Sequence, residues 1–303
     1  MIKLFTHTDL DGVGCAVLAK IAFGDNVDIS YCNYNEIDDY VSQFIHADSG
    51  YGIVHVTDIS VSSETAEVIN NADINITLLD HHATALALNR YSWCRVEVSG
   101  ENGMKTSGTE MYYQHLVQSG CLKQTAALDG FSNLIRDYDT WRWSELGEDG
   151  LICKKVNDLL YLYGREMFID WCISEIRTGE FPTLHFEDEV VLRVKQREID
   201  AYIDAKEAKM WKKNVLGYTC GVVFADKHFS ELGNKICQRH PEIDFCAMID
   251  MDGTISYRTV RDDINLGADI AKMFGGGGHA KAAGSRFSDE VIINLIIGLF
   301  QSN

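Results

Sequence analysis

Short apolar runs alternate with helix-like segments through the first third of the chain. The runs Ile2–Thr6, Val27–Cys32, Ile53–Thr57 and Ile74–Leu79 have the length and composition typical of buried strands. Segments of helical character separate them at Val13–Phe23, Asp38–Ala47 and Ser63–Asn70. This alternation predicts an α/β fold in which helices cover both faces of a parallel sheet.

Helical patterns dominate the sequence from there to about residue 178. One helix is expected to begin at Ser107, because Glu110 three positions later completes a capping box. Further helices are predicted at Gln124–Ile135, Leu151–Leu160 and Arg165–Arg177. We interpret Trp141 and Trp143 as core residues rather than as a platform on which bases stack.

The second half of the chain has its own pattern of elements. A charged segment, Glu187–Lys213, is interpreted as a solvated helix that connects two domains. Strands are then expected at Thr219–Phe224, Asp244–Ile249 and Thr254–Arg258, with helices at Phe229–Arg239 and Leu266–Phe274. We therefore predict an N-terminal parallel-sheet domain at residues 1–180, a helical linker at 181–213 and a smaller, mixed α/β C-terminal domain at 214–303.

Composition narrows the classes of partner. The 303 residues carry a formal net charge of −18, which disfavours general binding to long duplex nucleic acid because phosphate affinity requires clustered Lys and Arg. Nine cysteines without a C-x-x-C pair indicate reduced thiols. The start of the chain has no signal-peptide pattern, and the apolar stretch Val291–Phe300 has the length of a core helix, too short to span a bilayer. These features predict a cytoplasmic location and no membrane partner.

Acidic and histidine side chains recur where the predicted strands end. They form four segments in chain order, which are His7-Thr8-Asp9-Leu10-Asp11-Gly12, Asp58, Asp80-His81-His82 and Asp137-Tyr138-Asp139. Ligand sites of open α/β sheets lie at the carboxyl ends of strands, so the first three segments are expected to converge. Carboxylates and imidazoles collected in one place are most simply satisfied by a pair of divalent cations.

Two features of the second half suggest anion binding. The glycines Gly275–Gly278 allow backbone N–H groups to approach an anion closely, and His279 adds a further donor beside them. Arg258 ends a predicted strand, and its planar guanidinium suits a phosphate or carboxylate.

Taken together, these motifs resemble those of the DHH phosphoesterase superfamily. The His7, Asp58, Asp80 and Asp137 segments are similar to its four N-terminal motifs. Residues 275–284, GGGGHAKAAG, are similar to the G-G-G-H-x-x-A-A-G signature of its associated C-terminal domain. The resemblance covers both halves of the chain in the expected order, and the nanoRNase or oligoribonuclease branch fits its length best.

The resemblance implies a site for two metal ions. His7, Asp9 and Asp58 would hold the first ion. Asp11, Asp58, His81 and Asp137 would hold the second, with Asp58 as the bridge. Nitrogen and oxygen donors without a thiolate fit Mn²⁺ best, with Mg²⁺ or Co²⁺ as alternatives. In the fourth motif both Asp137 and Asp139 precede Trp141, and either could be the ligand. We favour Asp137, because its distance to Trp141 matches the spacing in the family, with Asp139 as a partner that orients a ligand.

The resemblance also implies a reaction and the residues that serve it. Asp58, Asp80 and His82 would be catalytic, with His82 directed at the phosphate. Arg258, Gly276, Gly277, Gly278 and His279 would bind substrate. The expected activity is hydrolysis of short oligonucleotides or linear dinucleotides to mononucleotides by a hydroxide that two metal ions activate. A homodimer is a further expectation, because members of the family often dimerise.

Other functions remain open from sequence alone. Within the same family, the chain could be a phosphatase of 3′-phosphoadenosine 5′-phosphate or a cyclic-dinucleotide phosphodiesterase. Outside it, a nonenzymatic nucleotide-binding module would use the same cleft, although binding alone requires fewer carboxylates. A metal-storage role would leave Arg258 and His279 unexplained.

Overall fold

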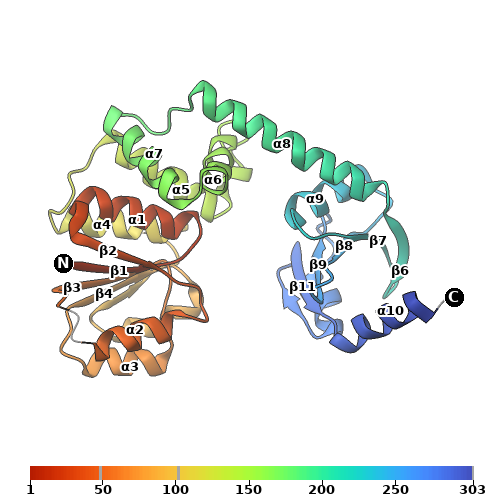
Figure 1. Ribbon diagram of the computed structural model, residues 1–303, viewed down its shortest axis with the longest axis horizontal. Coiled ribbons are helices and arrows are strands. Elements are labelled where there is room, and N and C mark those ends of the chain that lie inside the picture. Colours follow the sequence, from red (N-terminus) through yellow and green to blue (C-terminus); the bar gives the residue numbers. More distant parts are fainter. Residues whose placement is uncertain (48–49, 101–102, 302–303) are drawn as a thin grey trace. The chain divides into compact units, whose positions relative to one another are not determined.

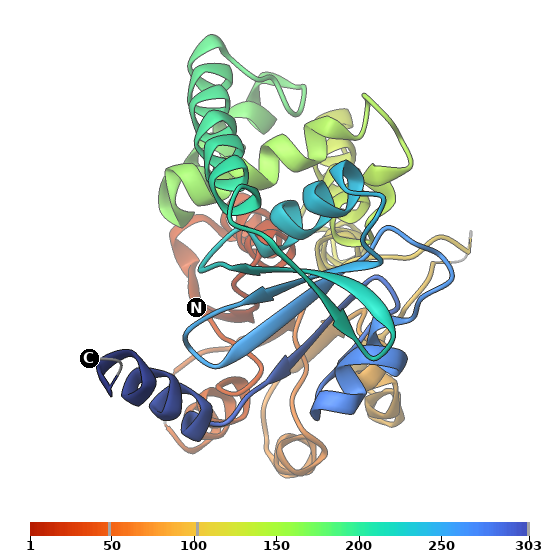
Figure 2. The ribbon, with the colours of Figure 1, turned by 90° about the vertical axis from the view of Figure 1, so that its right-hand side faces the viewer.

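The computed structural model describes residues 1–47, 50–100 and 103–301 (Figures 1 and 2). Contacts divide the chain into two units, Met1–Leu192 and Arg193–Asn303. The boundary falls within helix α8 (Phe186–Glu207).

The N-terminal unit is built on a five-stranded parallel sheet in the order β2-β1-β3-β4-β5. The strands are β1 (Ile2–Thr6), β2 (Val27–Tyr31), β3 (Ile53–Thr57), β4 (Ile76–Asp80) and β5 (Cys94–Val96). Its helices are α1 (Leu10–Phe23), α2 (Ile37–His46), α3 (Ser63–Asn71), α4 (Gly108–Gln118), α5 (Ala126–Asp139), α6 (Leu151–Tyr163) and α7 (Arg165–Thr178). Together with the mixed sheet of the second unit, this confirms the predicted α/β class.

Alternate side chains of the sheet enter two different cores. Leu4 and Leu79 pack with α1, α4 and α5, whereas Phe5 and Leu78 pack with α2 and α3 on the other face. Figure 1 shows these two helical layers on opposite sides of the sheet. Both faces are therefore buried, which explains why the strands are apolar runs rather than alternating ones.

The strand order places a topological switch point between β1 and β3. The chain leaves β1 into α1 on one face, and the helices α2 and α3 that flank β3 lie on the other. Such a point opens a crevice at the carboxyl ends of the strands. The first two acidic segments follow these two strands.

The C-terminal unit contains a mixed six-stranded sheet in the order β10-β11-β9-β8-β7-β6. The strands are β6 (Trp211–Val215), β7 (Tyr218–Phe224), β8 (Phe245–Ile249), β9 (Thr254–Arg258), β10 (Gly277–Gly278) and β11 (Ala282–Arg286). Only β7 and β8 pair in parallel among the described strands of this sheet. The helices are α9 (Phe229–Arg239) and α10 (Asp289–Gln301).

Three predictions for the second half were wrong in part. The charged segment Glu187–Lys213 ends its helix at Glu207 and continues into strand β6. The predicted helix Leu266–Phe274 is a short π-helical turn followed by a 3₁₀ turn. The apolar stretch Val291–Phe300 is helical, and its described side chains Val291, Ile293 and Ile297 are exposed, so these three lie outside any core.

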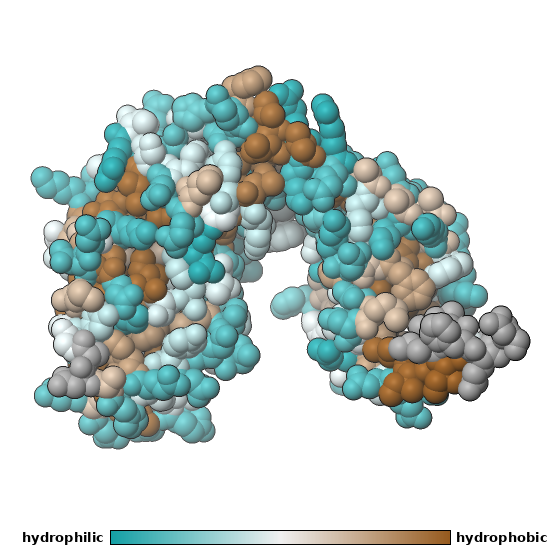
Figure 3. Space-filling view, viewed as in Figure 1, coloured by the Kyte–Doolittle hydropathy of each residue, from teal (hydrophilic) through white to brown (hydrophobic). Residues whose placement is uncertain are grey.

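Figure 3 shows hydrophobic residues at the surface where the described part of α10 lies. Across the described part of the chain, no helix has both the length and the apolar character that a membrane crossing requires.

Candidate metal and active site

Asp58 lies at the centre of the acidic segments. It follows β3 directly, adopts a left-handed backbone conformation (φ 58°) and is buried. Nε2 of His81 lies 3.2 Å from its Oδ1, and Nδ1 of His7 lies 3.9 Å from its Oδ2. Two imidazoles from two other strand ends thus approach the two oxygens of one carboxylate.

The start of α1 fixes two further carboxylates. Asp9 is the N-cap residue, accepting a hydrogen bond from the Gly12 amide at 3.1 Å, and Nδ1 of His7 lies 3.0 Å from its other oxygen. Asp11 is buried and accepts hydrogen bonds from the Gly108 and Thr109 amides at 2.6 and 2.8 Å. These two amides begin α4, where unpaired N–H groups favour an anion.

Three sets of side chains are spaced as metal ligands are. They are His7, Asp9 and Asp58; Asp11, His81 and Asp139; and Asp58, Asp80, His81 and His82. Within each set the candidate ligand atoms lie within 4.8 Å of one another. The structure therefore brings together all the predicted N-terminal site residues except Asp137.

The fourth motif differs from the prediction. Asp137 points to two guanidinium groups, that of Arg136 at 3.1 Å and that of Arg142 at 2.9 Å. Asp139, two residues later at the end of α5, lies 3.6 Å from Nε2 of His81. The structure thus places Asp139 rather than Asp137 beside the other carboxylates, and Asp137 pairs with the two arginines instead.

Burial and crowding raise the pKa of two of these carboxyl groups. Burial is the largest cause for Asp58, followed by the negative charges of Asp11 and Asp9, and its pKa lies well above the ordinary value. The same causes raise the pKa of Asp139 to about 8. In both cases the ionised form lacks enough positive charge nearby.

Divalent cations fit this arrangement. Among the described residues, Oδ2 of Asp58 is a buried atom without a hydrogen-bond partner, and Nδ1 of His7 makes no hydrogen bond of good geometry although it lies 3.0 Å from Oδ2 of Asp9. A buried polar atom in that state costs free energy unless another group satisfies it. A bound cation would supply that partner and would also offset the crowded carboxylates.

Asp80 has a different environment from Asp58. Its Oδ1 accepts hydrogen bonds from the His81 amide and from Nδ1 of His82, both at 2.7 Å, and Ser60 donates to its Oδ2. Burial acts to raise the pKa of Asp80, but the His82 and Ser60 bonds outweigh it and the net pKa is lowered. The same bond to Asp80 raises the pKa of His82. Asp80 therefore orients His82.

Arg258 and the glycine run lie at one end of the sheet in the C-terminal unit. Ala282 pairs with Arg258 across β11 and β9, and its carbonyl accepts a hydrogen bond from the His279 amide at 2.8 Å. Arg258 also donates to Ser230 Oγ at 3.0 Å. His279 and Arg258 thus flank the same residue, Ala282.

Close packing alone explains why two of these positions are glycine, and no bound anion is needed for that explanation. A Cβ at Gly276 would lie 2.0 Å from the Gly284 carbonyl oxygen, and one at Gly278 would lie 2.6 Å from Cα of Ala283. A Cβ at Gly277 would meet open space. The anion-binding interpretation therefore applies most directly to Gly277.

Sequence reasoning missed several residues around the acidic site. The amides of Gly108 and Thr109 donate to Asp11, which is about a hundred residues earlier in the sequence. The capping pattern at Ser107, whose hydroxyl accepts a hydrogen bond from the Glu110 amide, indicated that a helix begins here but not that it contacts Asp11. Trp141 was predicted to be core, but it is 56% exposed and only Trp143 packs against the core. Tyr34, which belongs to no motif, contacts His82.

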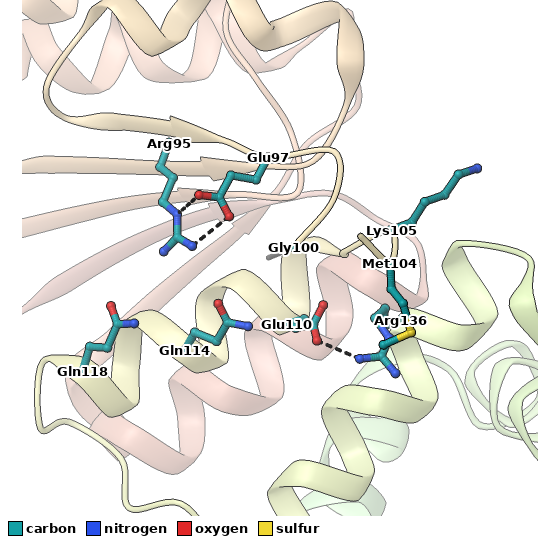
Figure 4. A pocket seen from close by; sticks show the side chains of 9 residues that line it. All are labelled: Arg95, Glu97, Gly100, Met104, Lys105, Glu110, Gln114, Gln118 and Arg136. Atoms are coloured by element: carbon teal, nitrogen blue, oxygen red, sulfur yellow. Dashed lines mark hydrogen bonds and ion pairs between the residues drawn. The ribbon is translucent and has the colours of Figure 1, made fainter. Parts of the chain in front are cut away.

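A separate pocket lies between β5 and α4 (Figure 4). Its volume is about 410 Å³, and its lining residues are Arg95, Glu97, Gly100, Met104, Lys105, Glu110, Gln114, Gln118 and Arg136. None of these belongs to the three sets of possible metal ligands. Arg136 in the pocket lining bonds both Glu110 and Asp137, and neither of these carboxylates belongs to the three sets.

Comparison with known proteins identifies one clear relative. Over 299 residues the chain is 37% identical to the oligoribonuclease NrnB of Bacillus subtilis (strain 168), in a match that covers 96% of this chain and 74% of NrnB. No protein-family model matches the chain.

Two solved structures share the fold. The pGpG-specific phosphodiesterase PggH from Vibrio cholerae is 14% identical, with a TM-score of 0.53 over 99% of this chain and 97% of PggH. RecJ from Thermus thermophilus, in complex with Mn²⁺, is 13% identical, with a TM-score of 0.54 over 98% of this chain and 51% of RecJ.

Proposed function

The chain belongs to the DHH phosphoesterase family, and we propose that it is a metal-dependent phosphodiesterase that hydrolyses short oligonucleotides or linear dinucleotides to mononucleotides. The similarity to the oligoribonuclease NrnB extends over 96% of the chain and so includes both units. The fold shared with a pGpG-specific phosphodiesterase is consistent with a dinucleotide substrate.

One observation carries the proposal. Four segments far apart in sequence bring their carboxylates and imidazoles together around Asp58, whose buried Oδ2 has no hydrogen-bond donor among the described residues. A site built only for structure would pair these groups with arginine or lysine, as Asp137 is paired with Arg136 and Arg142. The unpaired set is suited to divalent cations.

We assign the ligands from this geometry. His7, Asp9 and Asp58 would hold one ion, and Asp11, Asp58, His81 and Asp139 the other, with Asp139 in place of Asp137. All are oxygen or nitrogen donors, which suit Mn²⁺, Mg²⁺ or Co²⁺. When bound, such ions activate a water molecule as nucleophile and neutralise the phosphate oxygens.

The surrounding residues orient the groups that act on the phosphodiester. The α4 amides of Gly108 and Thr109 hold both oxygens of Asp11 in place. Asp80 holds Nδ1 of His82, so Nε2 is the atom left to meet a phosphate or leaving oxygen. The Asp80 bond, by raising the pKa of His82, favours the protonated imidazole, which donates a hydrogen bond or a proton.

The C-terminal unit carries groups that would bind a phosphate of the substrate. Arg258 presents a guanidinium at the end of β9, and His279 follows the glycine run, of which Gly276 and Gly278 shape the turn and Gly277 exposes its backbone. These groups suit the terminal phosphate of a short oligonucleotide. The net charge of −18 disfavours a long polyanion.

A substrate panel tests the proposal. The purified protein with Mn²⁺ would be incubated with an RNA dinucleotide, a five-residue RNA, a long single-stranded DNA, 3′-phosphoadenosine 5′-phosphate, cyclic di-AMP and pyrophosphate. We expect the fastest turnover on the dinucleotide or the five-residue RNA. Fastest turnover of the adenosine bisphosphate or of cyclic di-AMP would replace the proposal, and binding of the dinucleotide without any cleavage would indicate a binding module.

A further inference from the structure

Tyr34 lies beside the acidic site although no motif contains it. It occupies the turn between β2 and α2, and it is 57% exposed. Its ring centroid is 4.9 Å from that of His7 and 5.8 Å from that of His82. A large aromatic ring with an open face therefore stands next to histidines from two of the four motifs.

The negative charges of the acidic segments also act on the Tyr34 hydroxyl. The pKa of its hydroxyl is raised, first by burial and then by the negative charges of Asp58, Asp9, Asp80 and Asp139. All four acidic segments contribute to this shift. A phosphate held among these groups would therefore have the Tyr34 ring as a neighbour.

The hydroxyl of Tyr34 occupies the free nitrogen of His82. Nε2 of His82 lies 3.1 Å from the hydroxyl oxygen, while Nδ1 is engaged by Asp80. If His82 acts on the substrate through Nε2, the substrate oxygen must take the place of the Tyr34 hydroxyl. The substrate oxygen would then lie at the present position of the Tyr34 hydroxyl, close to the Tyr34 side chain.

The turn that carries Tyr34 is locally fixed. The carboxylate of Glu36 accepts hydrogen bonds from the amide and the side-chain amide of Asn33, at 2.8 and 2.9 Å. The backbone on both sides of Tyr34 is therefore tied together by these two bonds. A ring on a fixed turn is suited to stacking, since little order is lost when a base packs on it.

We propose that Tyr34 is the stacking platform for a nucleobase adjacent to the scissile phosphate, and that its hydroxyl yields Nε2 of His82 to the substrate. This inference rests on the proposed function and narrows its substrate class to phosphodiesters that carry a base beside the cleaved bond. Stacking on an aromatic side chain tolerates any base, which suits an enzyme that degrades short oligonucleotides without regard to sequence.

The test compares binding of a non-hydrolysable dinucleotide, with a methylene group in place of the bridging oxygen, in the presence of Mn²⁺. Tyr34→Ala should weaken binding roughly tenfold, within the range typical for loss of one base-stacking ring. Tyr34→Phe, which keeps the ring, should regain most of that loss. Tyr40→Ala, at an exposed tyrosine of α2 outside the site, serves as the matched control and should bind as the wild-type protein does.

Analogues that lack one of the two bases locate the contact. The tenfold effect of Tyr34→Ala should disappear for one of the two abasic analogues and persist for the other. An equal loss in Tyr34→Phe and Tyr34→Ala would overturn the inference in favour of a role for the hydroxyl alone. Unchanged binding in Tyr34→Ala, an effect that persists with both abasic analogues, or no binding by the wild-type protein would also overturn it.

Failure of the proposed function has a different signature. If the wild-type protein binds the analogue and Tyr34→Ala weakens binding, but no natural dinucleotide is cleaved with Mn²⁺, then the stacking platform stands and the hydrolytic activity is wrong. If the wild-type protein cleaves the dinucleotide and Tyr34→Ala binds the analogue normally, then the hydrolytic activity stands and the stacking platform is wrong.

Discussion

The Nδ1 atom of His82 donates a hydrogen bond of 2.7 Å to the buried carboxylate of Asp80. This bond leaves Nε2 as the only ring nitrogen of His82 that can reach a substrate. We expect Asp80→Asn to lower kcat for a dinucleotide by about 100-fold, because general acid catalysis typically contributes at least that factor. The measurement is steady-state turnover with saturating Mn²⁺, and a variant with kcat within about threefold of wild type would contradict the role of this pair.

The two aspartates of the fourth motif should respond differently to the same change. Asp139→Asn removes a carboxylate beside His81 and should reduce both turnover and Mn²⁺ affinity by at least about tenfold, as loss of a metal ligand or its close support does. Asp137→Asn should mainly reduce stability, by about 1–3 kcal/mol, because the buried guanidinium of Arg136 loses a charged partner.

The readouts are calorimetric Mn²⁺ titration and denaturant unfolding. If Asp137→Asn abolishes Mn²⁺ binding while Asp139→Asn retains it, the assignment of Asp139 is wrong.

A substitution at Gly108 tests whether the start of α4 must lie as close to Asp58 and Asp11 as it does. A Cβ at this position would lie 2.5 Å from Cβ of Asp58 and 3.1 Å from Oδ2 of Asp11. Gly108→Ala should therefore displace both carboxylates, lowering turnover more than about tenfold and stability by about 1–3 kcal/mol, as overpacking does. Gly52→Ala, where a Cβ meets open space, is the matched control and should change neither quantity appreciably. Normal turnover by Gly108→Ala would show that the approach is not required.

His55 predicts a pH dependence of stability that is separate from catalysis. Burial, with a smaller effect from the neighbouring His115, lowers the pKa of His55 to about 4. In the unfolded chain the pKa is near its ordinary value of about 6.5, so that between about pH 6.5 and 4 the unfolded state binds a proton that the folded state does not. The free energy of unfolding that is linked to His55 is therefore at its full value above about pH 6.5. It decreases by up to about 3 kcal/mol as the pH falls to about 4.

Urea unfolding at about pH 7 and about pH 4.5 measures this effect. His55→Gln, which can keep a hydrogen bond to Tyr112, should lose less stability over this interval than the wild-type protein. An equal loss in both proteins would contradict a neutral, buried His55.

The strand pattern was enough to predict where most of the site would form. Asp58 and Asp80 stand at the ends of apolar runs that became β3 and β4, and parallel strands bring such ends together. The boundaries were harder to predict. The helix expected to begin at Val13 begins at Leu10, so Asp9 caps it and Asp11 lies in its first turn.

The choice between Asp137 and Asp139 required the structure. Helix α5 continues beyond its predicted end at Ile135 to Asp139, and side chains two residues apart on a helix point in directions about 160° apart. Arg142 follows Trp141, which has a left-handed backbone (φ 66°), and its guanidinium lies 2.9 Å from Asp137. The spacing of residues along the sequence gives no indication of the turn at Trp141 that brings Arg142 to Asp137.

Strand β6 and helix α10 illustrate two other limits. The strand Trp211–Val215 is largely exposed and rich in lysine, as edge strands often are, so its sequence continues the charged pattern of α8. The length of the apolar stretch in α10 suits a core helix, but length and composition do not determine which of its side chains pack against the rest of the protein. The exposed residues Val291, Ile293 and Ile297 are the result.

The central claim is that the groups around Asp58 hold the divalent cations that hydrolysis requires. The most direct measurement is the rate at which metal-stripped protein releases mononucleotides from an RNA dinucleotide as Mn²⁺ is added, compared between the wild-type protein and Asp58→Asn. We predict a rate near zero without metal that rises to saturation for the wild-type protein, and no rise for Asp58→Asn. Equal rates with and without chelator, or full Mn²⁺ activation of Asp58→Asn, would contradict the claim.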